Sequence, residues 1–400
     1  MKLFRNAFLV AALTVFGSAA TPLFAQSEEG PGQAQGAAVD TTGKGYTAAY
    51  VLETSTKQVL FAENEHRPLP TASMAKMMTL LITMEEIKAG NLKYDTPVTI
   101  SARASKMGGS QIYLRAASVW PVKNLIIATM VQSANDAAQA LAEQIGGSSE
   151  SFADMMNARA QELGLTHSQF YDPHGLPNPK DPSRVDTMCP HDLAILGMEV
   201  MKYPFIAALA KVPEMPFRNG TLEKIYNPNH LINPRKANYM QDATGIKTGY
   251  SGPAGFCVTA SASRNNLDVV AVVMGAKTSG GTNGSFANAA RLMNQAFIQN
   301  RMVVPAKKGT VVGQAPVTGG RAATVPVTPA NDATALVKRG QEKGVTVAYQ
   351  GTGAVAAPVK KGQVVGTIVV QQNGKVLAKI PALAAEDVAK QQWWKSFWPF

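Results

Sequence analysis

The chain has 400 residues, of which 46% are hydrophobic and 16% are charged, and its formal net charge is +11. This length and hydrophobic content exclude a wholly disordered chain and suffice for two domains with a sizeable core. A basic protein can meet nucleic acid, anionic lipid or a polymer that bears carboxylates. The two cysteines, Cys189 and Cys257, allow at most one disulfide, and the sequence leaves open whether they pair.

The first 25 residues have the layout of a secretory signal peptide. Two basic residues precede an apolar run over 7–16, and small residues follow up to Ala25. The run is too short to span a bilayer comfortably, so we expect export and cleavage after Ala25. Export favours lipid or a wall polymer over nucleic acid as a partner. Residues 26–45 are rich in Gly, Ala, Gln and Thr without an apolar period, which predicts a flexible leader.

An α/β domain is predicted over residues 46–300. β-Prone runs at 46–53 and 58–62 predict a first hairpin, and runs at 255–262 and 267–274 predict a second one. The predicted helices cover residues 73–89, 121–131, 136–145, 151–163, 189–201 and 286–299. Two hairpins at the ends of the domain, with helices inserted between them, predict a sandwich whose sheet is assembled from both ends.

A small β-rich domain is predicted over residues 301–385. The composition shifts there to Val, Gly, Ala, Thr and Lys in short alternating runs, such as 344–349, 362–370 and 374–380. This region has no cluster of residue types typical of a catalytic site. A spacer or docking module is therefore the favoured interpretation.

Residues 386–400 are predicted to form an amphipathic membrane anchor. Three of the four tryptophans lie in the last eight residues, together with two phenylalanines. At helical spacing Trp394, Phe397 and Trp398 share one face, which suits a short helix lying in the membrane interface. The alternative is that these aromatic side chains pack on the β-rich domain.

Ser73-Met74-Ala75-Lys76 is the first of three motifs that together indicate acyl transfer through a serine ester. Ser73 stands at the start of a predicted buried helix, where backbone N–H groups face a developing oxyanion. Lys76 lies at i+3 on the same helix face. It can accept the serine proton only while it is neutral, which burial and a nearby cation favour, and Lys247 is the candidate cation.

The second motif, Ser133-Ala134-Asn135, falls between two helical patterns. In such a connection Ser133 can relay a proton to a leaving amine, and Asn135 can hold the substrate amide. The structural alternative is an N-cap for the following helix, a role compatible with catalysis.

The third motif, Lys247-Thr248-Gly249, lies where the pattern returns to strands. Gly249 lacks the side chain that would keep a substrate backbone away from a strand edge. An extended peptide can add there as a strand, with Lys247 and Thr248 binding its terminal carboxylate. The N–H of Tyr250 would then join that of Ser73 as an oxyanion hole. The five histidines show no close pairing with carboxylates, so no metal or cofactor is expected.

These motifs in this order, with Lys106-Met107-Gly108-Gly109-Ser110 between the first two, resemble the D-alanyl-D-alanine carboxypeptidases among the low-molecular-mass penicillin-binding proteins. The resemblance covers nearly the whole chain, including His174-Gly175-Leu176 and the β-rich C-terminal region. It implies a β-lactamase/transpeptidase-like fold and a serine-type enzyme that removes the terminal D-alanine from peptidoglycan pentapeptides. It also implies acylation by β-lactam antibiotics and a peripheral location on the periplasmic face of the cytoplasmic membrane.

Motif matching implies roles for individual residues. Ser73 corresponds to the acylated nucleophile and Lys76 to its proton acceptor. Ser133 and Asn135 correspond to the proton relay and a substrate ligand, and Lys247 to the substrate-binding cation. The chain departs from the family pattern at Tyr250, where many members have His, and at Lys277, where many have Arg.

Other functions remain open at this stage. A D,D-endopeptidase differs from the carboxypeptidase only in the far side of its substrate. A class A-like β-lactamase shares the motifs but needs a glutamate that activates water. Glu162 is the candidate by position, although the end of a helical run indicates a surface role. A wall-binding scaffold without activity is disfavoured because all the catalytic residue types are present.

Overall fold

A computed structural model describes residues 45–392, with gaps at 179–180, 182, 218–221 and 280–281. The predicted signal peptide lies outside the described residues. So do the predicted leader up to residue 44 and the aromatic part of the predicted anchor, residues 393–400.

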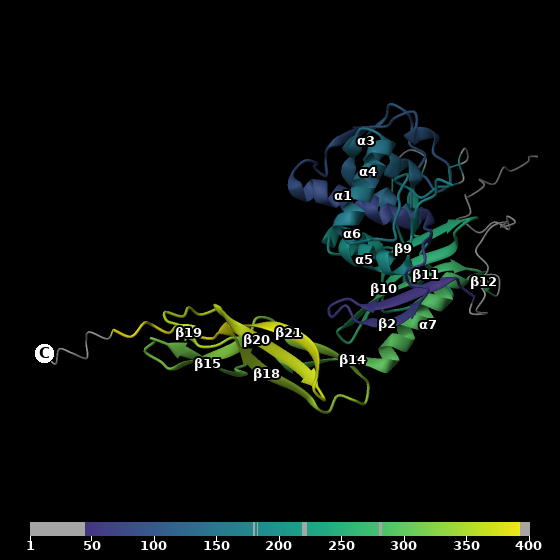
Figure 1. The fold of residues 1–400 in the computed structure, drawn as a ribbon. Coiled ribbons are helices and arrows are strands. Elements are labelled where there is room, and N and C mark those ends of the chain that lie inside the picture. Colours follow the sequence, from purple (N-terminus) through teal and green to yellow (C-terminus); the bar gives the residue numbers. More distant parts are fainter. Residues whose placement is uncertain (1–44, 179–180, 182, 218–221, 280–281, 393–400) are drawn as a thin grey trace, which may run out of the picture. The chain divides into compact units, whose positions relative to one another are not determined.

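A five-stranded antiparallel sheet forms the centre of the first domain (Figure 1). Its strands lie in the order β2-β1-β11-β10-β9, and Ala48 of β1 is opposite Met274 of β11. The strands are β1 (Ala48–Glu53), β2 (Val59–Glu63), β9 (Ala243–Ser251), β10 (Gly255–Arg264) and β11 (Leu267–Ala276). The chain thus assembles one sheet from both ends of the domain, which confirms the predicted sandwich.

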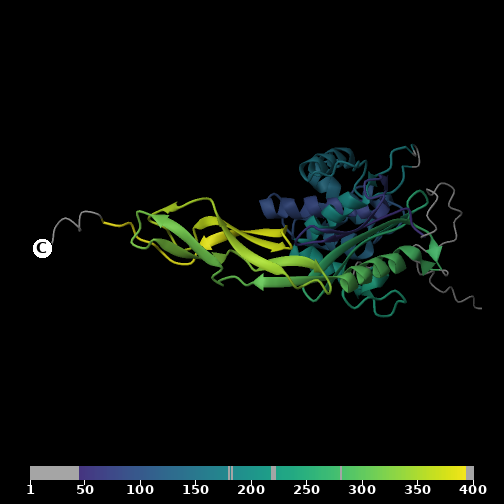
Figure 2. The same ribbon diagram turned by 60° about the horizontal axis from the view of Figure 1, so that its bottom comes forward.

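Both faces of this sheet are buried. Along β1, Tyr50 and Leu52 belong to one hydrophobic cluster, whereas Ala49 and Val51 belong to another. Successive side chains of a strand point to opposite faces, so the two clusters lie on opposite sides of the sheet. Helix α7 (Gly284–Gln299) packs on one side, and α5 (Pro190–Met201) packs on the other (Figure 1, Figure 2).

The other described helices of this domain form the insertion between β2 and β9. They are α1 (Lys76–Ala89), α2 (Val122–Ile127), α3 (Asn135–Gly146), α4 (Ser149–Glu162) and α6 (Pro204–Ala210). The predicted helix at 73–89 starts as the 3₁₀ turn η1 (Ala72–Ala75) before α1 begins. The helix predicted over 121–131 is wrong in its second half, where Ala128–Gln132 form a π-helical turn. Helix α6 was not predicted, although Pro204 suits its first turn.

Short elements connect these layers. Four two-stranded pairs and two further 3₁₀ turns occur among the described residues of the domain. They are β3 (Leu69–Pro70) with β6 (Thr187–Met188), β4 (Pro97–Thr99) with β5 (Val119–Pro121), β7 (Glu214–Pro216) with β8 (Lys224–Tyr226), β12 (Thr278–Ser279) with β13 (Thr282–Asn283), η2 (Ala104–Lys106) and η4 (His230–Ile232).

The described residues from 300 to 392 form strands and loops only. Six strands make one sheet in the order β18-β20-β21-β16-β15-β19, and β14 pairs with β17. These strands are β14 (Asn300–Ala306), β15 (Gly313–Thr318), β16 (Thr324–Pro329), β17 (Ala333–Lys338), β18 (Val345–Gly351), β19 (Val355–Ala356), β20 (Val364–Gln372) and β21 (Lys375–Ala384). The fold class predicted from the sequence, an α/β sandwich followed by a β-rich domain, is confirmed.

Within the described residues, no single helix is long and apolar enough to cross a membrane. Helices α5 and α6 have the length and apolar composition of a membrane span only when they are taken together, and a bend of 112° separates them.

Candidate active site

Ser73 and Lys76 face each other at the start of α1. Ser73 lies in the turn η1, and its Oγ accepts a hydrogen bond of 2.7 Å from Nζ of Lys76. The same Nζ donates to the carbonyl oxygen of His174 at 2.9 Å. Lys76 is completely buried, and Ser73 is 8% exposed. The serine hydroxyl is therefore at the edge of solvent, while the amine behind it is held by oxygen acceptors.

The second lysine–serine pair joins two distant parts of the chain. Ser133 follows the π-helical turn in the left-handed region, with φ of 60°. Its Oγ accepts a hydrogen bond of 2.7 Å from Nζ of Lys247, which also donates to the carbonyl oxygen of Thr248 at 3.2 Å. Lys247 is 2% exposed. Two buried lysine side chains thus each contact a serine hydroxyl.

Asn135 leaves one side-chain atom without a partner. Its Nδ2 donates to the carbonyl oxygen of Gly108 at 2.7 Å, and its backbone N–H donates to that of Ser110 at 2.7 Å. Its Oδ1 is buried and has no hydrogen-bond partner among the residues that the structure describes. Such an acceptor is costly to leave unpaired, so it marks a place for a donor such as a peptide N–H. The predicted N-cap role is not observed, because Ala134 takes the cap position.

The Lys-Thr-Gly motif lies in the middle of β9, at the edge of the sheet, and η1 packs against this strand. A Cβ at Gly249 would lie 2.6 Å from the carbonyl oxygen of Thr71 and 3.3 Å from Cβ of Ala72. Gly249 was predicted to let a substrate backbone approach the strand edge, but the structure shows a different role. The space that glycine leaves is taken by the segment that carries Ser73, not by solvent. Tyr250 is half-buried, and its ring stacks on Phe256 at 4.5 Å between centroids.

Asp172 shapes the loop that presents the His174 carbonyl to Lys76. Its Oδ1 lies 2.7 Å from Nδ1 of His174 and accepts from the N–H groups of His174 and Gly175 at 2.8 and 2.6 Å. Gly175 has φ of +79°, and a Cβ there would lie 1.9 Å from the carbonyl oxygen of Ala72. This loop therefore packs directly beneath the segment of Ser73.

Asp186 links the same loop to the segment before Ser73. Its Oδ1 accepts from the N–H of Tyr171 at 2.7 Å, and its carbonyl oxygen accepts from the N–H of Thr71 at 2.9 Å. Oδ2 is buried and has no partner among the described residues. Asp186 was not predicted from the sequence, because its partners are distant in the chain and no local motif marks it.

The pKa values of Asp172 and Asp186 are shifted in opposite directions. Burial acts to raise the pKa of Asp172, but the charge and hydrogen bonds of His174 outweigh it and lower that pKa. Burial raises the pKa of Asp186 well above its usual range, and the negative charge of Asp172 raises it further. Hydrogen bonds from Tyr171 and Asp172 and the charge of Lys76 act in the opposite direction on Asp186. Asp172 is therefore the ionised member of the pair.

Other residues considered from the sequence lie outside this constellation. Glu162 is exposed and forms an ion pair with Arg159 at 2.8 Å. Cys189 and Cys257 are buried and form no disulfide. Burial raises the pKa of each thiol to about 12, so neither is a thiolate nucleophile at neutral pH. Cys189 lies instead beside two histidines, His66 and His167, in an arrangement that sequence spacing did not reveal.

Comparisons with known proteins agree with this geometry. The family model described as D-alanyl-D-alanine carboxypeptidase matches residues 38–278, and that of the penicillin-binding protein 5 C-terminal domain matches residues 301–390. The D-alanyl-D-alanine carboxypeptidase DacF of Bacillus subtilis is 34% identical, over 86% of each chain. DacC of Escherichia coli is 31% identical, over 88% of this chain and 86% of its own.

Two further similarities bear on fold and function. Penicillin-binding protein 5 from Haemophilus influenzae superposes with a TM-score of 0.72 at 26% identity, covering 88% of this chain and all of that one. A D-alanyl-D-alanine endopeptidase of Pseudomonas aeruginosa is 30% identical, but over only 61% of this chain and 75% of its own.

The contact between Gly249 and the Ser73 segment predicts that Gly249→Ala slows acylation by penicillin. The added Cβ must displace Thr71 and with it Ser73, and a displacement of about 1 Å costs on the order of 100-fold in rate. Gly252→Ala is the matched control, because a Cβ there has no atom within 4 Å. The acylation rate is measured by intact mass after timed exposure to penicillin. Equal rates for both variants would contradict this account of the contact.

The raised pKa of Asp186 predicts a pH-dependent effect on stability. A carboxyl group whose folded pKa is raised contributes most below its unfolded pKa of about 3.9, and its contribution is lost as pH rises toward the folded pKa. In this interval the wild-type free energy of unfolding should fall relative to Asp186→Asn by about 1.4 kcal/mol per pH unit. Urea unfolding followed by the helical circular dichroism signal measures it, since all described α-helices lie in the first domain.

The exposed Asp154 offers a control for this experiment. Asp154→Asn should keep the wild-type dependence of stability on pH. If Asp186→Asn and wild type show the same slope at every pH above about 4, Asp186 is not the protonated group that its burial implies.

Proposed function

The chain belongs to the D-alanyl-D-alanine carboxypeptidase family of hydrolases, and we propose that it removes the terminal D-alanine of peptidoglycan pentapeptides through an acyl-enzyme on Ser73. The observation that carries this proposal is the pair of buried lysine–serine hydrogen bonds, Lys76 to Ser73 and Lys247 to Ser133. One pair suits activation of a nucleophile, and the other suits delivery of a proton to the leaving amine.

The substrate would bind along β9 as an added strand. Lys247 and Thr248 would hold the terminal carboxylate, and the unpartnered Oδ1 of Asn135 would accept an N–H of the peptide. The hydrogen bond from Asn135 to Gly108 fixes the side-chain amide, so that Oδ1 is already oriented before the substrate arrives. The fixed orientation of Oδ1 supports the proposal that an extended peptide binds between Asn135 and β9.

The reaction then follows from the two serine pairs. Oγ of Ser73 attacks the carbonyl carbon of the penultimate D-alanine while its proton passes to neutral Lys76. The N–H groups of Ser73 and Tyr250 stabilise the oxyanion. The C–N bond breaks as Ser133 passes a proton to the amine, which releases D-alanine and leaves an ester on Ser73. Attack by water on this ester regenerates the serine and releases the shortened peptide. A β-lactam offers its amide to the same nucleophile and remains attached as an ester.

An endopeptidase is the second candidate, because a relative of that class is 30% identical. Its match covers 61% of this chain, whereas the matches to DacF and DacC cover 86% and 88%. The match of residues 301–390 to the C-terminal domain of penicillin-binding protein 5 further supports the carboxypeptidase. Rates on pentapeptide monomers and on cross-linked dimers distinguish the two, and faster cleavage of dimers would favour the endopeptidase. A β-lactamase would need Glu162 to activate water, but Glu162 forms an ion pair with Arg159 on the surface and gives this function no support.

We further propose that the enzyme is exported by residues 1–25 and held at the outer face of the cytoplasmic membrane by residues 393–400, the aromatic end of the anchor predicted over 386–400. The start of that prediction is wrong, because Val388 is buried in the β-rich domain and pairs with Val359. The net charge of +11 falls only to +9 when Lys2 and Arg5 are removed with residues 1–25, and it favours an anionic surface. The aromatic side chains of the last eight residues suit the membrane interface. Export would bring the active site to the peptidoglycan.

The role proposed for Lys76 predicts that Lys76→Ala lowers the acylation rate by about 10² to 10⁴, the usual contribution of a positioned base. Intact mass after brief exposure to penicillin measures the rate, and tryptic mapping of the wild-type adduct tests attachment at Ser73. Release of D-alanine from a pentapeptide should fall in parallel. Near-normal acylation of Lys76→Ala, or an adduct on another residue, would refute this mechanism.

The proposed anchor predicts that deletion of residues 393–400 releases the protein into the soluble fraction with its carboxypeptidase activity retained. This deletion keeps Gln391, whose N–H donates to the carbonyl oxygen of Gly319 at 2.8 Å, so the described part of the β-rich domain is left intact. Fractionation after cell lysis and activity on a soluble pentapeptide are the two measurements. A truncated protein that stays with the membrane would show that these residues are not the anchor.

A further inference from the structure

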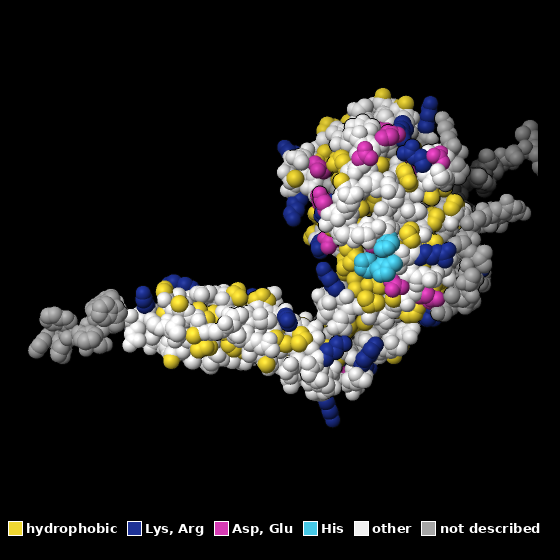
Figure 3. Space-filling view, in the orientation of Figure 1, with side chains coloured by type: hydrophobic (Ala, Val, Ile, Leu, Met, Phe, Trp, Pro, Cys, Tyr) yellow, Lys and Arg dark blue, Asp and Glu magenta, His cyan; other side chains and the backbone are white. Residues whose placement is uncertain are grey.

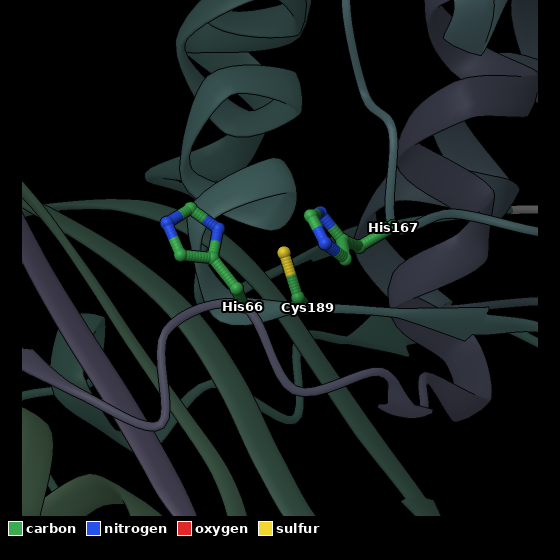
Figure 4. Close-up of side chains that lie close together, drawn as sticks. All are labelled: His66, His167 and Cys189. Atoms are coloured by element: carbon green, nitrogen blue, oxygen red, sulfur yellow. The ribbon is translucent and has the colours of Figure 1, made fainter.

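Three histidines and a cysteine form a cluster that includes no member of the two lysine–serine pairs. Ligand atoms of His66, His167 and Cys189 all lie within 4.8 Å of one another, and those of Cys189, His191 and Asp192 do as well. The His66 ring lies 5.3 Å from that of His167 and 5.1 Å from that of His191, between centroids. Figure 3 shows histidine side chains in one patch on the surface of the domain. Figure 4 shows the sulfur of Cys189 between the rings of His66 and His167.

The surrounding contacts orient these groups. The Asp192 carboxylate is buried, and its Oδ2 accepts from the backbone N–H of His167 at 2.8 Å. Its Oδ1 lies 3.0 Å from Nδ1 of His191. Nδ1 of His167 lies 3.1 Å from Oγ1 of Thr166, so its Nε2 is the ring nitrogen left for another ligand. A metal-bound imidazole usually has its second ring nitrogen held by a carboxylate, a backbone carbonyl or water, and Asp192 offers such a carboxylate to His191.

We propose that Cys189, His66 and His167 bind one Zn²⁺ ion, with His191 beside them as the candidate fourth ligand. Zinc prefers thiolate and imidazole ligands in tetrahedral geometry, at about 2.3 Å from sulfur and about 2.0 Å from nitrogen. Mg²⁺ and Ca²⁺ prefer oxygen ligands and do not suit this set. Binding converts the thiol of Cys189 into a thiolate and releases its proton to solvent. His66 is exposed, so the ion has access from the surface and that ring can adjust.

The three ligands stand on segments that lead to the active site. Strand β3 follows His66 and runs to Thr71, next to the segment of Ser73. Strand β6 precedes Cys189 and follows Asp186, whose carbonyl oxygen holds Thr71. The loop after His167 continues to His174, whose carbonyl oxygen holds Lys76. Zinc at this cluster therefore cross-links the three segments that support the nucleophile and its base.

The test uses the untagged mature protein after removal of metal with a chelator. Titration with ZnCl₂ by calorimetry should give one site, and Co²⁺ should give the charge-transfer absorption of a thiolate ligand. Cys189→Ser should abolish the cobalt–thiolate band, and His66→Ala should weaken zinc binding by at least about tenfold. Serine retains the helix-capping acceptor of Cys189, which receives the N–H of Asp192, so this variant is expected to fold.

Two variants outside the cluster serve as matched controls. Cys257→Ser removes the other buried cysteine, and His230→Ala removes a histidine that stacks on Phe286. Both should bind Zn²⁺ like the wild type. Zinc should raise the midpoint of thermal unfolding of the wild type and of both controls, but not that of Cys189→Ser. Absence of the cobalt–thiolate band in the wild type, or equal zinc binding by His66→Ala, would overturn the site.

Discussion

Two buried lysine side chains impose the main constraint on this fold. Lys76 and Lys247 are almost completely removed from water, and a buried cation is very costly unless the protein replaces its hydration shell. Each lysine receives that replacement from one serine hydroxyl and one backbone carbonyl oxygen. These acceptors are neutral. This arrangement suits groups that must exchange protons during a reaction.

The supporting structure is built mainly from backbone atoms and close glycine contacts. His174 contributes its carbonyl oxygen to Lys76, and Asp186 contributes its own to Thr71. Gly175 and Gly249 allow the segment of Ser73 to approach a loop on one side and β9 on the other, where a Cβ would overlap backbone oxygen. Three stretches of chain that are far apart in sequence therefore hold the segment that carries the Ser73 hydroxyl, and acyl transfer depends on such positioning.

Local patterns in the sequence were sufficient to predict the sandwich and the residues of its lysine–serine pairs. Period-two and period-3.6 hydrophobicity identified β1, β10, β11 and α7, because one face or both faces of these elements are buried. The π-helical turn after Ile127 was missed, since its apolar residues fit an α-helix equally well. Asp186 and the cluster around Cys189 could not be predicted from one sequence. Their partners are brought together by the pairing of β3 with β6 and by the bridge between Gln169 and Thr187. Elements this short leave no periodic signal in the sequence.

Backbone carbonyl oxygens hold Lys76 and Thr71, which leaves the side chains of the same segments available for the cluster around Cys189. Since Lys76 and Thr71 are held by carbonyl oxygens, the nearby side chains of these segments are not committed to the reaction. The pairing of Leu69 with Met188 sets the positions of the main chain. His66 and Cys189 lie outside this pair, so their side chains can bind a metal ion without disturbing the pairing. A metal bound there would act on the active site only by restraining the backbone. Its effect should therefore appear in stability and in the order of these segments before it appears in the chemistry of Ser73.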